Sequence, residues 1–511
     1  MNKLTSLMIL AGSLSKSEKR YFRLYSNLLS GAKKYMYLFD LIEAGISIDD
    51  LYSQFSAKYD GNSFNTAVKY LYQTIIDCLT YLQKKQNIQT RIFSMLSEAD
   101  ILYERALFDD AIEVLNKAKK LAVIYEISPL VLLSQRTELK YMNAMDFRNT
   151  TERQLINKQM KVMEEMKYIR SANLHAQLYD ILKHRLTYKG YARSEKQKED
   201  LNDLILSELH LIANNSYKGF ETQKLHLLFQ STYYLHSGNY KMAIRFYQTL
   251  IDLFETHRHI ILNPPIYYLQ AITGILNSLM AASLYKEMPF FINKLKEIEK
   301  SDYAAEFILN VRAHIFQYEF ACSFNIGNFD AVAGLIRRYE ETLFKKVSLL
   351  RLEIQLGLFL NLTILDLATG NLKSAHKNIK KIISAGKIFY VLPAYRHARL
   401  INLILQAELK NYDFLENEIK AIKRSIRYEK HTYSTEKLVF KFVLNHHLLA
   451  QQKTRNKLIK QIQTETVEID RNKYEQQLLV VFDFLSWMES KLTHCAFPEI
   501  LAKKNSNIHK I

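Results

Sequence analysis

The sequence predicts an all-α protein made of stacked helix pairs, and two observations support this fold class. First, a turn of Gly, Asn and an aromatic or Leu residue recurs at Gly238, Gly327 and Gly370. Weaker copies of the turn lie at Ala106, Ser283 and Lys410. From Gly238 onward the successive turns are 45, 44, 43 and 40 residues apart, and a near-constant interval indicates one unit stacked on itself. Second, the 511 residues include only 13 Gly and 6 Pro, too few for a many-stranded sheet.

Residues 1–90 are expected to form a separate N-terminal helical module. Ser15 and Glu18 have the spacing of a capping box that opens a helix. That helix should have an apolar face and a basic face, with Tyr21, Leu24, Tyr25 and Leu28 on the former and Lys16, Lys19, Arg20 and Arg23 on the latter. Helices at 36–42, 51–55 and 64–82 should follow, the second of them capped by Ser47. Three short helices before a long one fit a cap for the first repeat or a helix-turn-helix variant, and we favour the cap.

Residues 91–450 carry the repeats. In the segment 101–118, small and apolar residues recur at fixed spacings: Ala106, Phe108, Ala111, Leu115 and Ala118. The pattern returns after Gly238 at Tyr240, Ala243, Tyr247 and Leu250. These spacings resemble the tetratricopeptide-repeat family, although the interval here is near 44 rather than 34 residues and the early Trp and closing Pro of that family are absent. The resemblance implies a right-handed α-solenoid of about eight or nine antiparallel helix pairs. HEAT-type pairs, whose periods reach into the forties, remain an alternative.

Between Ala106 and Gly238 the interval is 132 residues, which equals three further units of 44. Residues 145–190 fit the pattern least well, and the polar run 193–200 is expected to be a long loop. Residues 451–511 should contain closing helices and a tail. Residues 438–449 and 457–465 are expected to form a last, ninth pair across this boundary, and 474–492 an apolar helix with the only tryptophan, Trp487. That helix should close the solenoid, or else dock another chain, and Pro498 should end it.

The tetratricopeptide resemblance also implies a binding groove, because in that family the first helix of each pair lines the concave face. The groove positions carried over are Asp100, Glu104, Thr232, His236, Asn277, His314, Gln317, Asn325, His397 and Glu408. None of these residues is Lys or Arg, and the mixture of neutral polar and acidic side chains suits recognition of a peptide. The leading expectation is therefore a protein-binding or peptide-binding scaffold.

A net charge of +18 and a pI near 9.4 favour polyanionic partners. The candidate contacts are Lys16, Lys19, Arg20 and Arg23 near the N-terminus, and Lys373, Lys377, Lys380 and Lys381 on a second helix. A solvated helix face is the simplest interpretation of the second set. The alternative function is a nucleic-acid-associated regulator with an N-terminal basic reader and a repeat domain as sensor. A structural subunit without a discriminating ligand is a third interpretation.

Other function classes find no support in the sequence. It lacks the motifs of zinc sites, phosphate-binding loops, dinucleotide folds and serine hydrolases, so we expect no metal, cofactor or catalytic residues and no enzyme activity. Cys78, Cys322 and Cys495 are scattered, which is typical of reduced thiols in a cytoplasmic protein. No apolar run approaches the roughly 20 residues of a membrane-spanning helix, and the run at residues 7–11 is too short for a signal peptide.

Overall fold

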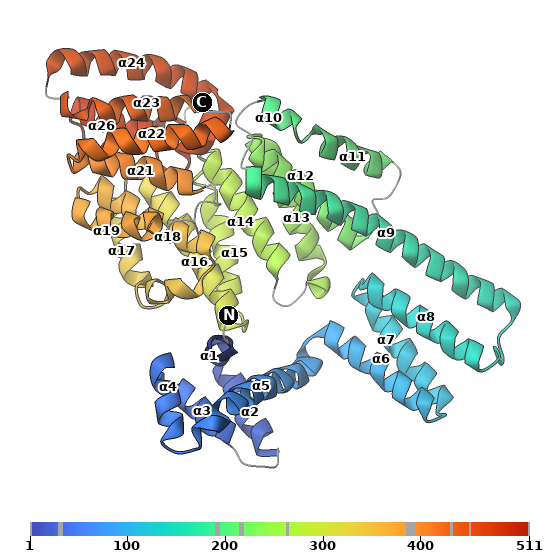
Figure 1. Cartoon of the computed structure of the whole chain (residues 1–511). Helices are drawn as coiled ribbons and strands as arrows, with labels where there is room; N and C mark the ends of the chain where they lie inside the picture. Colours follow the sequence, from blue (N-terminus) through green and yellow to red (C-terminus); the bar gives the residue numbers. More distant parts are fainter. Residues whose placement is uncertain are drawn as a thin grey trace. The chain divides into compact units, whose positions relative to one another are not determined.

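The computed structural model describes residues 3–28, 34–189, 195–213, 219–261, 265–384, 394–429, 433–448 and 451–508. Within these ranges the chain is all α, with 26 α-helices, a few short 3-10 turns and no strand (Figure 1). Consecutive helices pack against each other, as the sequence predicts. The chain divides into two compact units. Of the described residues, unit 1 holds those within 3–170 and 302–308, and unit 2 holds those within 171–261, 265–301 and 309–508.

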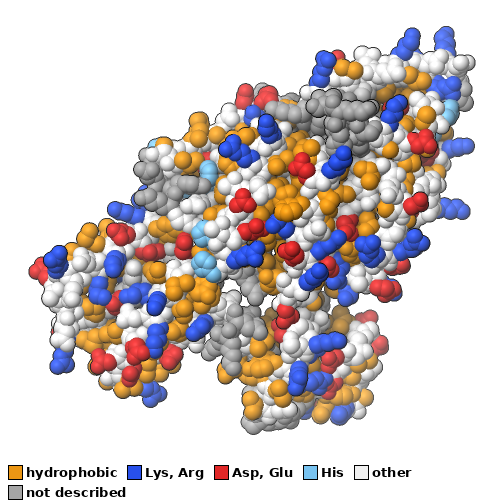
Figure 2. Space-filling view, turned by 180° about the vertical axis from the view of Figure 1, so that it is seen from behind, with side chains coloured by type: hydrophobic (Ala, Val, Ile, Leu, Met, Phe, Trp, Pro, Cys, Tyr) orange, Lys and Arg blue, Asp and Glu red, His pale blue; other side chains and the backbone are white. Residues whose placement is uncertain are grey.

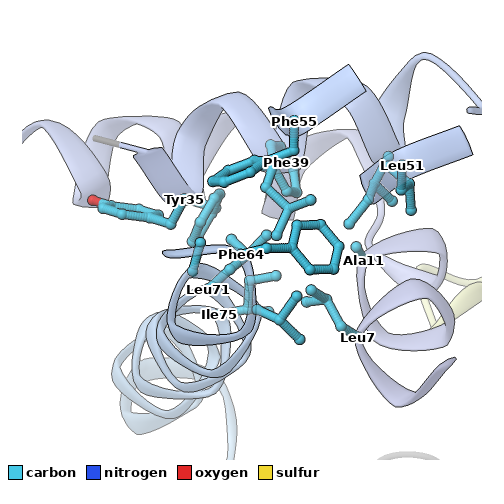
Figure 3. Close-up of a cluster of buried hydrophobic side chains, with 14 of the residues drawn as sticks. Leu7, Ala11, Tyr35, Phe39, Leu51, Phe55, Phe64, Leu71 and Ile75 are labelled. Carbon is cyan, nitrogen blue, oxygen red and sulfur yellow. The ribbon is translucent and has the colours of Figure 1, made fainter. Parts of the chain in front are cut away.

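Unit 1 begins with five helices around one apolar core. They are α1 (Lys3–Ser13), α2 (Lys16–Leu28), α3 (Lys34–Glu43), α4 (Ile48–Ser56) and α5 (Phe64–Gln86). The long helix α5 contacts each of the other four. Figure 3 shows aromatic and aliphatic side chains from these helices converging, among them Leu7, Phe39, Phe55 and Leu71, all of which are fully buried. The apolar run at residues 7–11 therefore belongs to this core.

Local signals at the N-terminus are confirmed in part. The Ser15 amide donates to the Glu18 carboxylate at 2.7 Å, and the Glu18 amide donates to Ser15 Oγ at 3.2 Å, which is the predicted capping box. The predicted apolar face of α2 is wrong, because Leu24 and Leu28 are exposed while Phe22 is buried. The helix is rotated so that the Phe22 ring packs on the ring of Phe39 in α3, with centroids 4.7 Å apart.

The rest of unit 1 is a run of helices α6 (Ile88–Glu104), α7 (Phe108–Ile124), α8 (Ser128–Ala144) and the first part of α9 (Glu152–Lys189). Helix α9 is continuous over 38 residues. The expectation of three regular units between Ala106 and Gly238 is therefore wrong, since no turn interrupts residues 152–189. The loop expected at 193–200 is also corrected, because Glu195–Glu199 forms the short helix α10. Residues 190–194 lie outside the described part of the chain.

Unit 2 continues with consecutive helix pairs. The rest of α9 and α10 begin this unit. The other helices before the C-terminal segment are α11 (Asn202–Ala213), α12 (Phe220–His236), α13 (Tyr240–Thr256), α14 (Ile266–Ala281), α15 (Met288–Glu299), α16 (Ala305–Asn325), α17 (Phe329–Tyr339), α18 (Leu352–Ala368), α19 (Leu372–Ile383), α21 (Ala394–Glu408), α22 (Tyr412–Glu429) and α23 (Ser434–Leu444). Helix α16 belongs to unit 2 from Leu309 onward. Each of α12, α14, α18 and α21 packs closely on the helix that follows it.

The predicted turns share one backbone geometry. All six turn residues have a positive φ, with values from 58° to 80°: Ala106, Gly238, Ser283, Gly327, Gly370 and Lys410. After each turn, the next amide donates to the carbonyl five residues earlier, as Asn239 does to Tyr234 at 2.9 Å. This is the Schellman ending of a helix. The residue five positions after each turn residue, such as Ala243 or Val332, is buried, which lets the two helices approach closely.

The first helices of the pairs in unit 2 are buried on nearly all sides. Residues 227–233 of α12 and 400–407 of α21 are buried without interruption. A helix that is buried all round lies between two layers. For α12 one of these layers includes α11, because the buried carboxylate of Glu208 accepts hydrogen bonds from Gln230 and pairs with His226. Tyr179 of α9 accepts a hydrogen bond from Gln270 of the next first helix, α14.

The C-terminal segment consists of α24 (Gln452–Arg471), α25 (Lys473–Leu479), α26 (Phe484–Thr493) and α27 (Phe497–Ile508). The single helix expected at 474–492 is wrong, because residues 480–483 are not helical. The expectation that Pro498 ends a helix is also wrong. Pro498 lies in the first turn of α27, where a missing amide hydrogen costs no hydrogen bond. None of the described helices combines the length and apolarity needed to cross a bilayer.

Candidate functional site

Two of the groove positions in unit 2, Asn277 and Gln317, lie between consecutive first helices. Tyr318 of α16 donates to Asn277 of α14 at 3.0 Å, which joins two of these helices directly. The side chain of Gln317 reaches α18. A Cβ atom added at Gly357 of that helix would lie 2.5 Å from the side-chain nitrogen of Gln317. Thr232 is buried, and Asn325 donates to the carbonyl of Ala321 in its own helix at 2.8 Å. Asn277 and Gln317 therefore join neighbouring first helices, and Thr232 is enclosed in the packing.

The histidines at groove positions are also enclosed. Burial lowers the pKa of His236 and of His314 to about 4 in each case. The His314 ring stacks on Tyr318 with centroids 6.4 Å apart. His397 is half-buried on α21. A neutral imidazole is a poor contact for an acidic peptide, so the positions of His236 and His314 suit structural packing.

The C-terminal segment lies against the ends of several first helices of unit 2. Gln477 of α25 donates to the carbonyl of His236 at 3.4 Å, at the end of α12. Lys491 of α26 forms an ion pair with Glu408 at 2.7 Å, at the end of α21. A Cβ atom added at Gly327 would lie only 2.4 Å from the carbonyl oxygen of Pro498 in α27. The chain therefore fills this end of the predicted groove with its own helices.

The groove positions of unit 1 have a different environment. Asp100 and Glu104 are exposed on α6, and Asp100 accepts a hydrogen bond from Tyr141 of α8 at 2.6 Å. Tyr103 of α6 stacks on the same ring with centroids 4.1 Å apart, which fixes the two first helices side by side. The structure thus brings α6 and α8 together and leaves their outer faces open.

Large apolar side chains are exposed on these two helices. Phe93 and Ile101 on α6 are each 53% exposed, and Leu133 on α8 is 45% exposed. We define the α6–α8 surface by six residues: Phe93, Asp100, Ile101, Glu104, Leu133 and Lys140. Glu104 and Lys140 form no ion pair with any residue that the structure describes. The repeat register predicted the two acidic residues but not the apolar ones, although Phe93, Ile101 and Glu104 have the spacing of one helix face.

A second exposed apolar stripe lies on the unit 1 part of α9. Ile156, Met160 and Met163 are spaced four and three residues apart, and each is more than half exposed. Methionine side chains adapt to differently shaped partners. Lys158, on another face of the helix, forms an ion pair with the buried Glu138 of α8 and attaches this part of α9 to the preceding helices.

The basic cluster of α2 is partly neutralised within unit 1. Arg23 forms ion pairs with Asp40 at 2.8 Å and with Glu43 at 2.6 Å, and Lys19 lies 3.4 Å from Glu43. The Arg23 guanidinium lowers the pKa of Glu43 below its ordinary value. Lys16 and Arg20 stay exposed beside a shallow depression of about 350 Å³. Two of the four candidate cations are therefore engaged by carboxylates of the neighbouring helix α3.

The lysines of α19 are in a different state. Lys373, Lys377, Lys380 and Lys381 are all exposed, and none forms an ion pair with a residue in the described part of the chain. Figure 2 shows that Lys and Arg side chains are interspersed with carboxylates over one face of the molecule. Helix α19 itself contains no Asp or Glu. Among the described residues, no three His, Cys, Asp or Glu side chains come together as metal ligands would.

Comparison with known proteins adds no family to these observations. No protein-family model matches the chain, and no curated protein matches it.

Proposed function

We propose that this chain is a non-enzymatic scaffold that binds another protein through an open helical surface. Its helix pairs would form a right-handed tetratricopeptide-like solenoid of about eight or nine pairs, with α9 as an irregular element. The shared geometry of the six turns, at intervals of 40 to 45 residues after Gly238, supports a repeated unit.

The observation that carries the proposal is the α6–α8 surface. Exposed Phe93, Ile101 and Leu133 lie on first helices whose counterparts in unit 2 are enclosed by other parts of the chain. Exposed large apolar side chains on neighbouring helices are typical of docking sites for proteins. We therefore assign peptide binding to the first helix pairs, where Asp100 and Glu104 would be the polar contacts.

The charges of this surface define the partner. Glu104 lies on α6 and Lys140 on α8, and both are exposed. A complementary segment has apolar side chains between a basic residue that meets Glu104 and an acidic residue that meets Lys140. We therefore propose an amphipathic peptide segment with charges of opposite sign on its two edges, in contrast to a uniformly acidic or basic ligand.

The test begins with peptides selected from a displayed random library on the full-length chain. Swapping the two charges, Glu104→Lys with Lys140→Glu, leaves the net charge unchanged. It should weaken the selected peptides at least about tenfold, since two attractive pairs become repulsive. Peptides synthesised with their own two charges exchanged should recover binding to the swapped variant.

A matched control is the exposed pair Glu341 and Lys345 of unit 2, which lie 2.6 Å apart. Exchanging these charges also preserves the net charge, and binding should be unchanged. Equal losses in both variants, or selected peptides that ignore the α6–α8 exchange, would show that the binding surface lies elsewhere.

A further inference from the structure

We propose that the outer face of α19 binds a flexible chain of phosphates through a row of lysines, independently of the peptide surface. Lys373, Lys377 and Lys381 follow one another at four-residue spacing, so they lie on the same face of the helix with Lys380 beside them. At about 1.5 Å per residue the row extends over about 12 Å, long enough to meet more than one phosphate of a chain.

The carboxylates near α19 do not neutralise this row. The nearest acidic residue before it, Asp366 of α18, accepts hydrogen bonds from Ser374 at 2.6 Å and from Asn378 at 3.0 Å, on the inward side of α19. No acidic residue occurs in the sequence between Asp366 and Glu408. Glu408 itself is engaged by Lys491. The positive charge of the row is therefore left for solvent or a ligand.

The row also costs stability within the chain. Like charges four residues apart on a helix destabilise it, and the row contains two such pairs, Lys373 with Lys377 and Lys377 with Lys381. One of these lysines, Lys381, has an attractive contact among the described residues, because its ammonium lies 4.8 Å from the centre of the Phe359 ring. A bound polyanion would relieve the repulsion.

The chemistry of the face points to phosphate and not to bases. Helix α19 contains no Phe, Tyr or Trp on which a base could stack, and its one imidazole, His376, contacts Gln406 of α21 at 3.4 Å. Recognition then depends on the spacing and charge of the phosphates alone. Single-stranded nucleic acid and inorganic polyphosphate share this chemistry. The structure favours α19 over α2 because two of the four α2 cations are already paired.

The experiment measures binding of a fluorescent oligo(dT) to the full-length chain by anisotropy as salt rises from about 50 to about 200 mM. Four lysine contacts on a single strand should reduce affinity about 50-fold over this range. Lys377→Gln with Lys380→Gln should leave two contacts, so that the loss over the same range falls to about sevenfold. Replacing the same two lysines with Arg should keep the original salt dependence.

The matched control removes two charges from the other basic cluster, Lys16→Gln with Arg20→Gln, and should leave binding and its salt dependence unchanged. Unlabelled polyphosphate should displace the oligo(dT). The proposal is overturned if oligo(dT) does not bind at the lowest salt, if the α2 variant loses binding while the α19 variant keeps it, or if polyphosphate fails to compete. The circular dichroism of each variant checks that its helices are intact.

Discussion

Gly327 gives the sharpest test of how the C-terminal segment is held. Its φ is +80°, and a Cβ atom placed there would lie 2.4 Å from the carbonyl oxygen of Pro498. Gly327→Ala therefore introduces two separate costs. The left-handed backbone disfavours any side chain, and the methyl group displaces the start of α27.

Two other glycines separate these costs. Gly370 has nearly the same φ, +77°, but nothing within 4 Å of the added Cβ, so Gly370→Ala should cost only the backbone term of about 1–2 kcal/mol. Gly274 lies inside α14, where the added Cβ would meet the Tyr247 ring at 2.2 Å. Overpacking in Gly274→Ala should lower the free energy of unfolding by about 1–3 kcal/mol. The higher helix propensity of Ala should offset about 1 kcal/mol of this loss.

Gly327→Ala should combine the backbone cost with a packing cost. Displacing Pro498 also removes Phe497 from its place beside Phe324, Phe329 and Phe482, whose ring centroids lie 5.7 to 6.3 Å away. Burying one Phe side chain is worth about 1.5–3 kcal/mol. The total expected for Gly327→Ala is about 2.5–5 kcal/mol, above the cost of about 1–2 kcal/mol for the Gly370 variant.

The assay pairs urea unfolding with amide hydrogen exchange. Unfolding midpoints rank the three variants, and exchange locates the damage. Amides of α27 should lose protection in Gly327→Ala and keep it in Gly370→Ala. Equal stability of these two variants, with α27 protected in both, would refute the close approach of Pro498 to the turn.

Two further predictions concern titratable groups. Burial raises the pKa of Cys78 and of Cys322 to about 11, so both thiols stay protonated at pH 8. A thiol reagent should therefore modify the exposed Cys495 rapidly and the other two cysteines only after unfolding. Rapid modification of all three cysteines would contradict the packing around Cys78 and Cys322. Burial lowers the pKa of His236 and His314 to about 4 from an ordinary 6.5, so the unfolded chain binds protons first as pH falls. The free energy of unfolding that these two histidines contribute should be fully present above pH 6.5 and should fall toward pH 4 by about 1–3 kcal/mol for each. The double variant His236→Gln with His314→Gln should show a flatter pH profile in urea unfolding.

The features that were predictable from sequence are local. The turns at Gly238, Gly327 and Gly370 were predictable because a left-handed residue and the small residue that follows at a fixed offset are encoded within a few positions. The Ser15 capping box follows the same logic. The continuity of α9 was missed because the repeat interval was extrapolated through a segment that contains no turn signal.

The site was less predictable because its exposure depends on distant segments. Positions such as His236 and Glu408 follow from the repeat register, yet whether they are open depends on Gln477 and Lys491, which lie far along the sequence. A pattern within one helix cannot reveal that a second layer covers it. The same limit applies to Leu24, whose exposure depends on how α2 is rotated against α3 and α5.

The most direct test of the scaffold proposal is hydrogen exchange of the full-length chain with and without a peptide selected on it. If the peptide binds the α6–α8 surface, amides of α6 and α8 around Ile101 and Leu133 should gain protection, with no change in α12, α16 or α21. Protection confined to those unit 2 helices, with α6 and α8 unaffected, would contradict it.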